Sequence, residues 1–498
     1  MSANYILLPA TAASTTRKKN PKLFELLSNL SRIAGDKGKT HMIKSLRLGP
    51  VMATKKKEPT MKVLDSVHAN GAKLVECSVS PVDLRFDFPG MRVIQNTLFS
   101  MARVEPKSII RAASTQLGIA TSIVVTDAQG HPVKKAKVVA YTNFKKEDGD
   151  EGYTDSKGRV SLKIGKGKKI ERLYIYPPAG CWPAMLTNRV LKNDDVIKLE
   201  NIEPGHVDSF RHFYDTNDAV KFPPIGKSKL KIAVVDSGIA PHPDLLIDGG
   251  MNMVTDGVKG DFTDHFGHGT HVAGIIGGKG LYKGIAAGVK LRAYNIYPKN
   301  VERAEAFALL KAIAQAVSDG CHLVNLSLTT SESNEAVTAA IREAYEKGVL
   351  CIAAAGNDNR KPVGFPASYS LCISVSALGR LKTFPKTALQ REYYQKPHAK
   401  DKNTFFASFS NLGEQIDVIA PGVGIISTMP GGHYGVQDGT SMSCPIVTGL
   451  CARYLLQNPN VLKMPANQQR SDAMLALIND GFKTLGFNSR FEGKGILL

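Results

Sequence analysis

No apolar run of the sequence reaches the roughly 18 residues that a membrane-spanning helix needs, so the chain offers no membrane span. The pattern of a secretory signal is also missing. The apolar stretch YILLPATAA near the N-terminus is short, and the basic residues Arg17, Lys18 and Lys19 follow it, whereas a signal places its positive charges first. We therefore expect a cytoplasmic location, with secretion by another route left open.

Cysteines are few, and they do not form a disulfide framework. There are seven in 498 residues, an odd number without regular spacing, and several lie in apolar stretches such as GVLCIAAAG. These features favour reduced thiols buried in a core. The seven are Cys77, Cys181, Cys321, Cys351, Cys372, Cys444 and Cys451.

Acidic residues are scarce at the N-terminal end. The formal net charge is +20, and residues 1–60 hold twelve Lys and Arg against three acids. A basic arm of this kind can bind nucleic acid, an acidic membrane surface or an acidic partner. The sequence has no signature of a nucleic-acid-binding fold, so we do not expect nucleic acid as the partner.

The chain is long enough for several domains, and 43% of its residues are hydrophobic. Patterning divides it into three segments. Residues 1–104 have the expected order β-α-β-β-α-β, a ferredoxin-like α+β fold with helices over 20–35 and from Ser80. Residues 115–203 contain short alternating strands divided by turns such as AQGHP and DSKGR, which predicts a small β-sandwich.

The third segment, residues 210–498, alternates strands with helices. The strands KIAVVD, HLVNLSL and VLCIAAAG are continuous apolar runs, which is typical of strands buried on both faces. Helices are expected from His268, over 304–320 and over 334–348. The pattern predicts an α/β fold with a parallel sheet and helices on both of its faces.

Three potential nucleophiles crowd the stretch DGTSMSCPIVTG, residues 438–449. The apolar spacing that follows predicts a helix, and Pro445 is expected in its first turn, where the missing N–H is not needed. Ser441 then lies at a helix N-terminus, whose free N–H groups favour an anion. A serine there is often only a helix cap, so a catalytic role needs partners elsewhere.

Two such partners are present in the third segment. The strand KIAVVD ends in Asp236, and a buried carboxylate needs a partner. The stretch DHFGHGTHVAGIIGG places His268 at a helix start, and histidine suits proton transfer near neutral pH. Reactive groups gather at the carboxyl edge of a parallel sheet, which makes Asp236, His268 and Ser441 candidates for nucleophilic catalysis.

The stretches VVDSGIAPHPDL, HGTHVAGIIGG and DGTSMSCP resemble the Asp, His and Ser motifs of the subtilisin-like serine proteases, in the same chain order. VLCIAAAGNDN is similar to the strand that ends in the family's oxyanion-hole asparagine, here Asn357. The resemblance implies a serine endopeptidase in which Ser441 attacks the peptide carbonyl, His268 transfers the proton and Asp236 orients the imidazole. Asn357 and the Ser441 N–H would bind the oxyanion.

Neighbouring polar side chains have more ordinary interpretations. Ser443 and Cys444 lie further along the helix of Ser441, so we expect them to pack and to make hydrogen bonds within the fold. His271 follows His268 by three residues and is expected inside its helix as a buried structural histidine.

The stretch LVNLSLTT resembles the strand that lines the family's specificity pocket, so Ser327, Leu328 and Thr329 are expected to bind substrate. Ser327 and Leu328 would offer their backbone to an extended peptide, and Thr329, in place of the family's usual glycine, would narrow the pocket. The glycine-rich edge that often clamps the peptide's other side is not seen in YPKNVERAEAF. The calcium-binding loop of many secreted members is also missing, so we expect no metal and no cofactor.

Residues 1–104 are similar to the family's inhibitory propeptides through VLDSVHANGAKLVECS and PGMRVI, and residues 115–203 look like a carboxypeptidase-regulatory or transthyretin-like sandwich. The first resemblance implies a zymogen inhibited by its own N-terminal domain, whose tail lies in the cleft and is cut between Phe99 and Lys107. The expected partners are a protein or peptide substrate and that N-terminal domain. The alternative is a permanently plugged scaffold that docks an acidic partner or nucleic acid through its basic N-terminal region.

Overall fold

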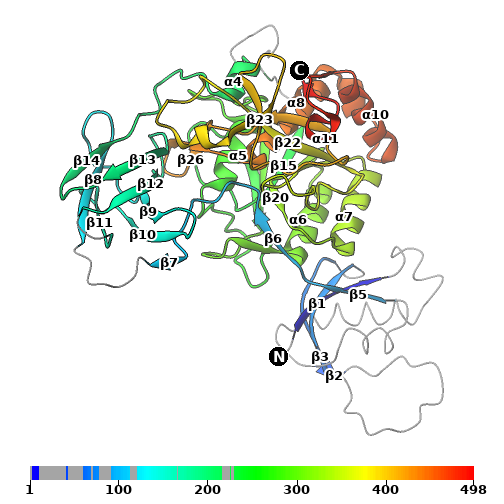
Figure 1. Cartoon of the computed structure of the whole chain (residues 1–498). Coiled ribbons are helices and arrows are strands. Elements are labelled where there is room, and N and C mark those ends of the chain that lie inside the picture. The colour runs from blue at the N-terminus through cyan, green and yellow to red at the C-terminus, as the bar shows by residue number, and fades with distance from the viewer. Residues whose placement is uncertain are drawn as a thin grey trace.

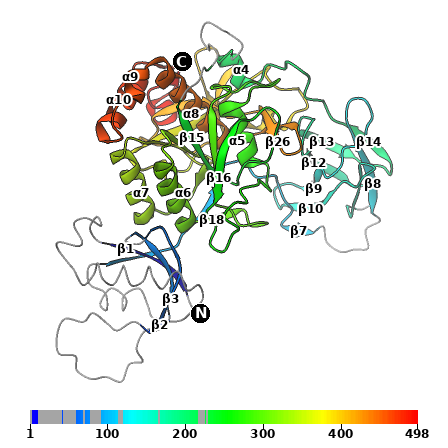
Figure 2. The same ribbon diagram turned by 180° about the vertical axis from the view of Figure 1, so that it is seen from behind.

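The chain forms three units in space, which Figures 1 and 2 show from opposite sides. We call them the N-terminal unit, the two-sheet unit and the C-terminal unit. The two helices predicted over 20–35 and from Ser80 fall outside the described residues. In the part of the chain that is described, no helix is both long and apolar enough to cross a membrane. The computed structural model describes residues 3–9, 41–42, 60–68, 71–77, 91–112, 120–164, 167–215, 225 and 229–498.

The C-terminal unit is built on a nine-stranded sheet with the order β16-β17-β15-β19-β21-β22-β24-β23, in which β25 also pairs with β22. The predicted parallel pairing is confirmed for the neighbouring strands β16, β17, β15, β19, β21 and β22 and for β25 beside β22. β24 and β23 are antiparallel additions at one edge. Continuous apolar runs form the central strands because both sheet faces are covered. The strands are β15 (Lys231–Asp236), β16 (Ile247–Asn252), β17 (Lys290–Asn295), β19 (Leu323–Leu326), β21 (Leu350–Ala354), β22 (Cys372–Arg380), β23 (Tyr394–His398), β24 (Thr404–Ala407) and β25 (Val418–Pro421).

Helices cover the two faces of this sheet, as Figure 1 shows. One apolar core joins the sheet to α5, α8 and α10, and a second joins its other face to α6 and α7. The sequence therefore predicted the layers of this unit correctly. The helices are α4 (Ser209–Phe213), α5 (His268–Gly277), α6 (Ala306–Ser318), α7 (Glu335–Glu346), α8 (Thr440–Gln457), α9 (Pro459–Leu462), α10 (Gln468–Asn479) and α11 (Ser489–Glu492). A small hairpin is formed by β26 (Ile425–Met429) with β27 (His433–Gln437), and β28 (Phe482–Lys483) pairs antiparallel with β29 (Ile496–Leu497).

The two-sheet unit lies beside the C-terminal unit. One sheet has the order β13-β12-β9-β10-β7 and the other the order β11-β8-β14. Both sheets contribute to a single apolar core that contains Ile123, Val138, Val160 and Leu173. The strands are β7 (Arg111–Ala112), β8 (Thr121–Thr126), β9 (Lys137–Asn143), β10 (Asp148–Tyr153), β11 (Arg159–Leu162), β12 (Lys169–Tyr176), β13 (Ala184–Val190) and β14 (Asp195–Lys198).

The N-terminal unit contains an antiparallel sheet with the order β2-β3-β4-β1-β5. Its apolar residues Ile6 and Leu74 belong to the same core as the buried face of α6 and α7. Polar contacts add to this packing, because Asp65 pairs with Lys311 and Arg92 lies 3.3 Å from Glu335. The strands are β1 (Ala3–Pro9), β2 (His41–Met42), β3 (Thr60–Ser66), β4 (Lys73–Cys77) and β5 (Met91–Gln95).

All seven cysteines fall within the described residues, where each is buried and none forms a disulfide bond. Burial raises the pKa of the thiols of Cys351 and Cys451 to about 12, because an apolar environment disfavours the thiolate. The prediction of reduced core thiols is confirmed.

Phe99 lies in the tail that leads from the N-terminal unit into the C-terminal unit, and its side chain is fully buried in the shared core. We predict that Phe99→Ala weakens the docking of this tail by about 3–5 kcal/mol, because it removes a buried ring and leaves a cavity. Hydrogen exchange at the amides of residues 303–305 and 328–329 measures the loss. Leu98→Ala is the matched control, since Leu98 is 47% exposed, and equal exchange in both variants would contradict the prediction.

Candidate active site

The tail of the N-terminal unit passes between two strands of the C-terminal unit. β6 (Leu98–Met101) pairs antiparallel with β18 (Arg303–Glu305) on one side and with β20 (Leu328–Thr329) on the other. A strand on the β18 side was not predicted, because VERAE lacks the glycine-rich pattern of the edge that often clamps the peptide in this position. The structure nevertheless places backbone there, so the peptide is held from both sides.

Backbone hydrogen bonds continue beyond β6. The Ala102 N–H donates to the Ser327 carbonyl at 3.1 Å, and the Ala102 carbonyl accepts from the Ser441 N–H at 2.8 Å. One residue after Arg103, the Val104 N–H donates to the Asp438 carbonyl at 2.8 Å. The tail thus runs through the site in an extended form, and the bond between Ala102 and Arg103 lies beside Ser441.

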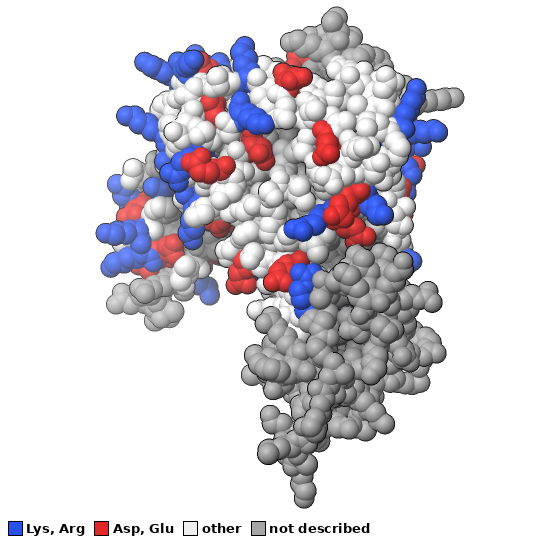
Figure 3. Space-filling model, turned by 90° about the vertical axis from the view of Figure 1, so that its right-hand side faces the viewer, with Lys and Arg blue, Asp and Glu red and all other residues white. Residues whose placement is uncertain are grey.

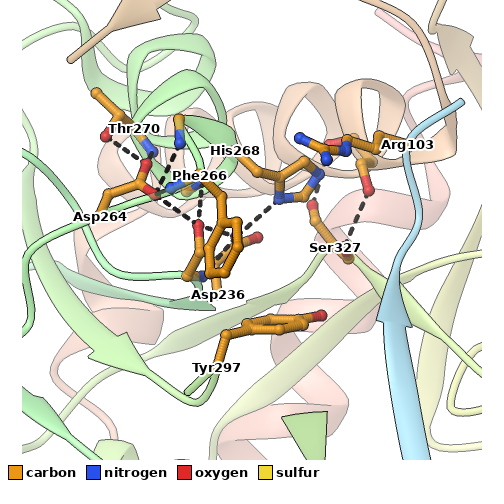
Figure 4. Close-up of polar contacts among 12 residues, drawn as sticks. Arg103, Asp236, Asp264, Phe266, His268, Thr270, Tyr297 and Ser327 are labelled. Atoms are coloured by element: carbon orange, nitrogen blue, oxygen red, sulfur yellow. Dashed lines mark hydrogen bonds and ion pairs between the residues drawn. The ribbon is translucent and has the colours of Figure 1, made fainter. Parts of the chain in front are cut away.

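Asp236 and His268 are in direct contact, as Figure 4 shows. Asp236 ends β15, and its Oδ1 lies 2.7 Å from Nδ1 of His268, the first residue of α5. Both side chains are buried, and the Ser237 N–H also donates to Asp236 Oδ1 at 2.7 Å. The carboxylate therefore holds the proton on Nδ1, which leaves Nε2 of His268 as an acceptor without a hydrogen-bond partner.

The hydroxyl of Ser441 is not bonded to His268. Its Oγ donates to the carbonyl of Ser327 at 2.9 Å, while Nε2 of His268 stays unpartnered. The structure thus brings two of the three predicted residues into contact and places the third on the adjacent helix α8. The Ser441 hydroxyl must therefore give up its hydrogen bond to the Ser327 carbonyl before it can donate to His268.

Helix α8 begins at Thr440, which puts Pro445 in the second turn. The prediction that Pro445 lies in the first turn is wrong. A proline at this position leaves the carbonyl of Ser441, four residues earlier, without its helical donor. The hydroxyl of Ser327 donates to that carbonyl at 3.0 Å, so the lost helical bond is replaced by a contact from the neighbouring strand.

Asn357 is held in place by the start of α8. Its Oδ1 accepts from the Thr440 N–H at 2.9 Å and from the Thr440 hydroxyl at 3.0 Å, which leaves Nδ2 buried and unpartnered. A Cβ placed on Gly439 would lie 2.6 Å from the Ala102 oxygen and 3.1 Å from Asn357 Nδ2. The Ala102 oxygen and Asn357 Nδ2 therefore both lie against Gly439, where only glycine fits, at a φ of 144°.

Thr329 faces two glycines across the pocket that begins beside Ala102. A Cβ on Gly364 would lie 2.2 Å from Thr329 Oγ1, and one on Gly356 would lie 3.1 Å from it. The Thr329 side chain thus occupies space that is free only because Gly356 and Gly364 have no side chains. Thr329 and Asn357 line a cleft of about 1010 Å³, whose far wall includes Phe144 and Tyr176 of the two-sheet unit.

The other polar residues near the site lie where the sequence predicted. His271 is buried in α5 beside the Ile425 carbonyl, 3.0 Å from its Nε2, and burial lowers its pKa to about 3. Ser443 donates to the Ala420 carbonyl at 3.0 Å, and Cys444 is buried with its Sγ 3.3 Å from Asn325 Oδ1. These three residues serve the packing of the helices.

Asp264 is a residue that the sequence reasoning missed. Its carboxylate accepts from the Gly267 N–H at 2.9 Å and the Thr270 N–H at 2.8 Å, at the start of α5, and from the Ser237 hydroxyl at 2.9 Å. It therefore fixes both the helix start that carries His268 and the residue after Asp236. The signal was available, since an acid just before a helix start is a common cap.

Arg103 and Glu302 form a second contact that was missed. Nη2 of Arg103 lies 3.0 Å from Glu302 Oε2, and Nε lies 3.2 Å from Glu105 Oε1. Burial lowers the pKa of Arg103, but the charges of Glu105 and Glu302 outweigh it and raise the pKa overall. No sequence pattern could link residues 199 positions apart. Within the described ranges, no group of His, Cys, Asp and Glu side chains is placed to bind a metal ion.

Asp438 is buried in the turn before Ser441, and burial raises its pKa from 3.8 to about 7, although the Gly424 N–H and Gln390 partly oppose the shift. The folded chain therefore keeps a proton that the unfolded chain releases near pH 4. Between pH 4 and 7 the unfolded state loses this proton first, so the free energy of unfolding should fall by about 2–4 kcal/mol.

Asp438→Asn removes this titration, and urea unfolding of both proteins across this pH range measures the difference. Both proteins carry Ser441→Ala, so that they differ only at residue 438. If the free energy of unfolding depends on pH in the same way in both proteins, the raised pKa of Asp438 is contradicted.

Comparisons with known proteins agree with this geometry. The sequence profile of the subtilase family, peptidase S8, matches residues 227–489. The minor extracellular protease Epr of Bacillus subtilis is 37% identical over 235 residues, which are 46% of this chain and 32% of that protein. Subtilisin BL of Lederbergia lenta is 35% identical over 237 residues, 47% of this chain and 78% of that protein. The thermostable alkaline protease of Halalkalibacterium halodurans is 33% identical over 245 residues, 48% of this chain and 61% of that protein. Because the profile covers just over half of the chain and the subtilisin match covers most of that enzyme, the chain belongs to the subtilase family of serine endopeptidases.

Proposed function

We propose that this chain hydrolyses peptide bonds as a serine endopeptidase, with Asp236, His268 and Ser441 as its catalytic residues. The observation that carries the proposal is the hydrogen bond from the Ser441 N–H to the Ala102 carbonyl, in a peptide paired as a strand on both sides. A peptide held in this way presents one carbonyl carbon to the residue that bears the nucleophile. Membership of the family supports the same reaction.

The reaction starts when the Ser441 hydroxyl turns from the Ser327 carbonyl to Nε2 of His268. His268 then accepts the proton while the Ser441 oxygen bonds to the peptide carbon. Asp236 stabilises the imidazolium through its contact with Nδ1. The proton passes from Nε2 to the leaving nitrogen, and water releases the acyl group in the reverse sequence.

The oxyanion is stabilised by two donors, the Ser441 N–H and Nδ2 of Asn357. Thr440 supports this role because it occupies Oδ1 of Asn357 and so directs the amide nitrogen toward the reacting carbonyl. Both donors are in place before the charge develops, and such preorganised donors contribute most where water is excluded.

Substrate binding is proposed for the backbone of Ser327 and Leu328 and for the side chain of Thr329. Ala102 stands as the substrate residue before the scissile bond, and its small side chain is consistent with a pocket that Thr329 narrows. The partners are therefore protein or peptide substrates with a small residue at this position.

We further propose that the chain is a zymogen whose N-terminal unit inhibits it, with domains 1–104, 115–203 and 210–498. The strand order β3-β4-β1-β5 supports a ferredoxin-like first domain, and the two sheets around one core support a small β-sandwich as the second. The expected cut between Phe99 and Lys107 narrows to the bond between Ala102 and Arg103.

The alternative of a permanently plugged scaffold, docking an acidic partner or nucleic acid, is not favoured by any observation on the described residues. Its basic arm, residues 1–60, lies largely outside them. On the face that Figure 3 shows, described Lys and Arg side chains alternate with Asp and Glu, so no surface of one charge is formed there.

Ser441→Ala is predicted to abolish hydrolysis and self-processing while leaving the fold intact, because it removes one hydroxyl. Mass spectrometry after identical incubation should find residues 1–102 and 103–498 in the unaltered protein and one intact chain in the variant. Ser443→Ala is the matched control and should be processed normally. An intact unaltered chain with full peptidase activity would refute the processing and the inhibition, and activity in the Ser441 variant would refute the mechanism.

Asn357→Ala is predicted to lower kcat by about 100- to 1,000-fold, the loss known for the corresponding donor in subtilisin, with little change in KM. The reason is that Asn357 contacts the carbonyl oxygen only as its charge develops. Steady-state kinetics on a soluble peptide separates the two constants. A raised KM with an unchanged kcat would mean that Asn357 binds substrate instead.

A further inference from the structure

A short segment of the C-terminal unit lies between the two-sheet unit and the turn that precedes Ser441. This bridging segment, residues 387–393, includes the 3-10 helix η1 (Leu389–Tyr393). The Met185 N–H donates to the Thr387 carbonyl at 3.1 Å, and the Leu389 N–H donates to the Pro183 carbonyl at 3.1 Å. The backbone of the two-sheet unit therefore holds the start of the segment in a fixed place.

A charged contact holds the other end. Glu392 Oε1 accepts from Arg172 Nη1 at 2.5 Å and from the Tyr174 hydroxyl at 2.8 Å. Both donors come from β12, and the Arg172 guanidinium also stacks 3.7 Å above the ring of Phe144. Burial raises the pKa of Tyr174, so its hydroxyl keeps the proton that it donates. Glu392 Oε1 thus accepts hydrogen bonds from two side chains of β12, and one of them, Arg172, is itself held against Phe144.

The same 3-10 helix reaches the turn of the nucleophile through Gln390. This side chain is fully buried, and its Nε2 donates to Asp438 Oδ2 at 2.8 Å. Asp438 Oδ1 accepts from the Gly424 N–H at 2.7 Å, and the Asp438 carbonyl accepts from the Val104 N–H. A buried carboxyl group that loses one of its two donors is destabilised, so the position of Gln390 constrains Asp438.

Main-chain contacts also hold the turn, since the Gly439 N–H donates to the Gly422 carbonyl at 2.8 Å and the Thr440 N–H donates to Asn357 Oδ1 at 2.9 Å. Gln390 is the side chain that donates to the Asp438 carboxyl group itself. Gly439 has no side chain, and its φ of 144° is one that only glycine adopts freely. Ser441 follows Asp438 by three residues, and its N–H must stay within hydrogen-bond distance of the substrate carbonyl. A displacement of this turn would move the nucleophile and the oxyanion donor together.

We propose that the two-sheet unit positions the nucleophile, because Arg172 and Tyr174 hold Glu392, and the helix η1 carries that restraint through Gln390 to Asp438 and the turn of Ser441. Arg172, Tyr174, Glu392 and Gln390 are assigned as positioning residues because, among the described residues, no hydrogen bond joins them to residues 98–104, although Arg172 and Glu392 line the cleft that the tail occupies. The inference rests on the proposed function, since it assigns these residues a part in the same reaction.

The proposal predicts a specific effect on kcat and KM, because peptide binding and the placement of Ser441 depend on different parts of the site. Peptide residues before the scissile bond bind to β18 and β20, which the bridging segment does not form. Loss of the Glu392 contact should therefore lower kcat and leave KM nearly unchanged. We expect Glu392→Ala to reduce kcat by about 10- to 100-fold, the size of effect that a small misplacement of a reacting group produces.

The experiment uses the full chain after it has completed its own processing and the N-terminal unit has been diluted away. The substrate is a chromogenic peptide anilide with the sequence Phe-Ser-Met-Ala, which copies residues 99–102 and has no residues after the scissile bond. Gln390→Ala should lower kcat as Glu392→Ala does, and the double variant should be no worse than either single one, because the two residues act in series. Glu392→Gln keeps a carbonyl acceptor at the same place and should recover part of the rate.

Arg159→Ala is the matched control. It breaks the exposed ion pair with Asp194, 2.6 Å long, in the same two-sheet unit and should change neither constant. Tyr174→Phe removes only a hydroxyl and replaces Glu392→Ala in the test if that variant fails to fold. Unchanged kcat in Tyr174→Phe and Gln390→Ala, or additive losses in the double variant, would overturn the positioning role. Absence of activity in the unaltered, processed protein would instead contradict the proposed function.

Discussion

Backbone pairing on both sides of β6 is the interaction on which the rest of the site depends. It fixes the peptide plane after Ala102, and only in that orientation can the carbonyl accept from the Ser441 N–H. The small residues around it follow from this constraint. Gly439 must let the peptide approach the turn, and Gly356 and Gly364 must leave room for Thr329. Side-chain recognition is thus secondary to a geometry imposed by main-chain hydrogen bonds.

Backbone contacts also explain how about 100 residues can separate the tail from the C-terminal unit without disturbing the site. The chain leaves the cleft directly onto the two-sheet unit. The Lys107 N–H donates to the Tyr176 hydroxyl at 3.1 Å, and the Ile109 N–H donates to Glu151 Oε2 at 2.9 Å. β7 then joins β10 as a parallel strand. The two-sheet unit lies beside the cleft because the residues that follow the tail, from Lys107 on, bind to it directly.

The sequence predicted those parts of the site that lie on regular elements. A buried apolar strand had to end at Asp236, and α5 and α8 had to begin near His268 and Ser441, because local patterning determines where strands and helices stop. The sequence could not predict that β18 binds the peptide, because this strand has three residues and pairs only with β6, which is distant in the sequence. Nor could it place Pro445 in the second turn, because the donor that makes this tolerable, Ser327, comes from another strand.

The tail that fills the cleft is covalently joined to folded units at both of its ends. A tethered peptide competes with free peptides as if it were dissolved at a very high local concentration, on the order of millimolar for a short linker. Soluble peptides at micromolar concentration would be outnumbered about a thousandfold at the same site. The proposed cut after Ala102 would remove one tether, and the N-terminal unit would then become an ordinary ligand that can be diluted away. Arg103 and the residues after it keep their attachment to the two-sheet unit, and any incoming chain must still displace them from their half of the cleft.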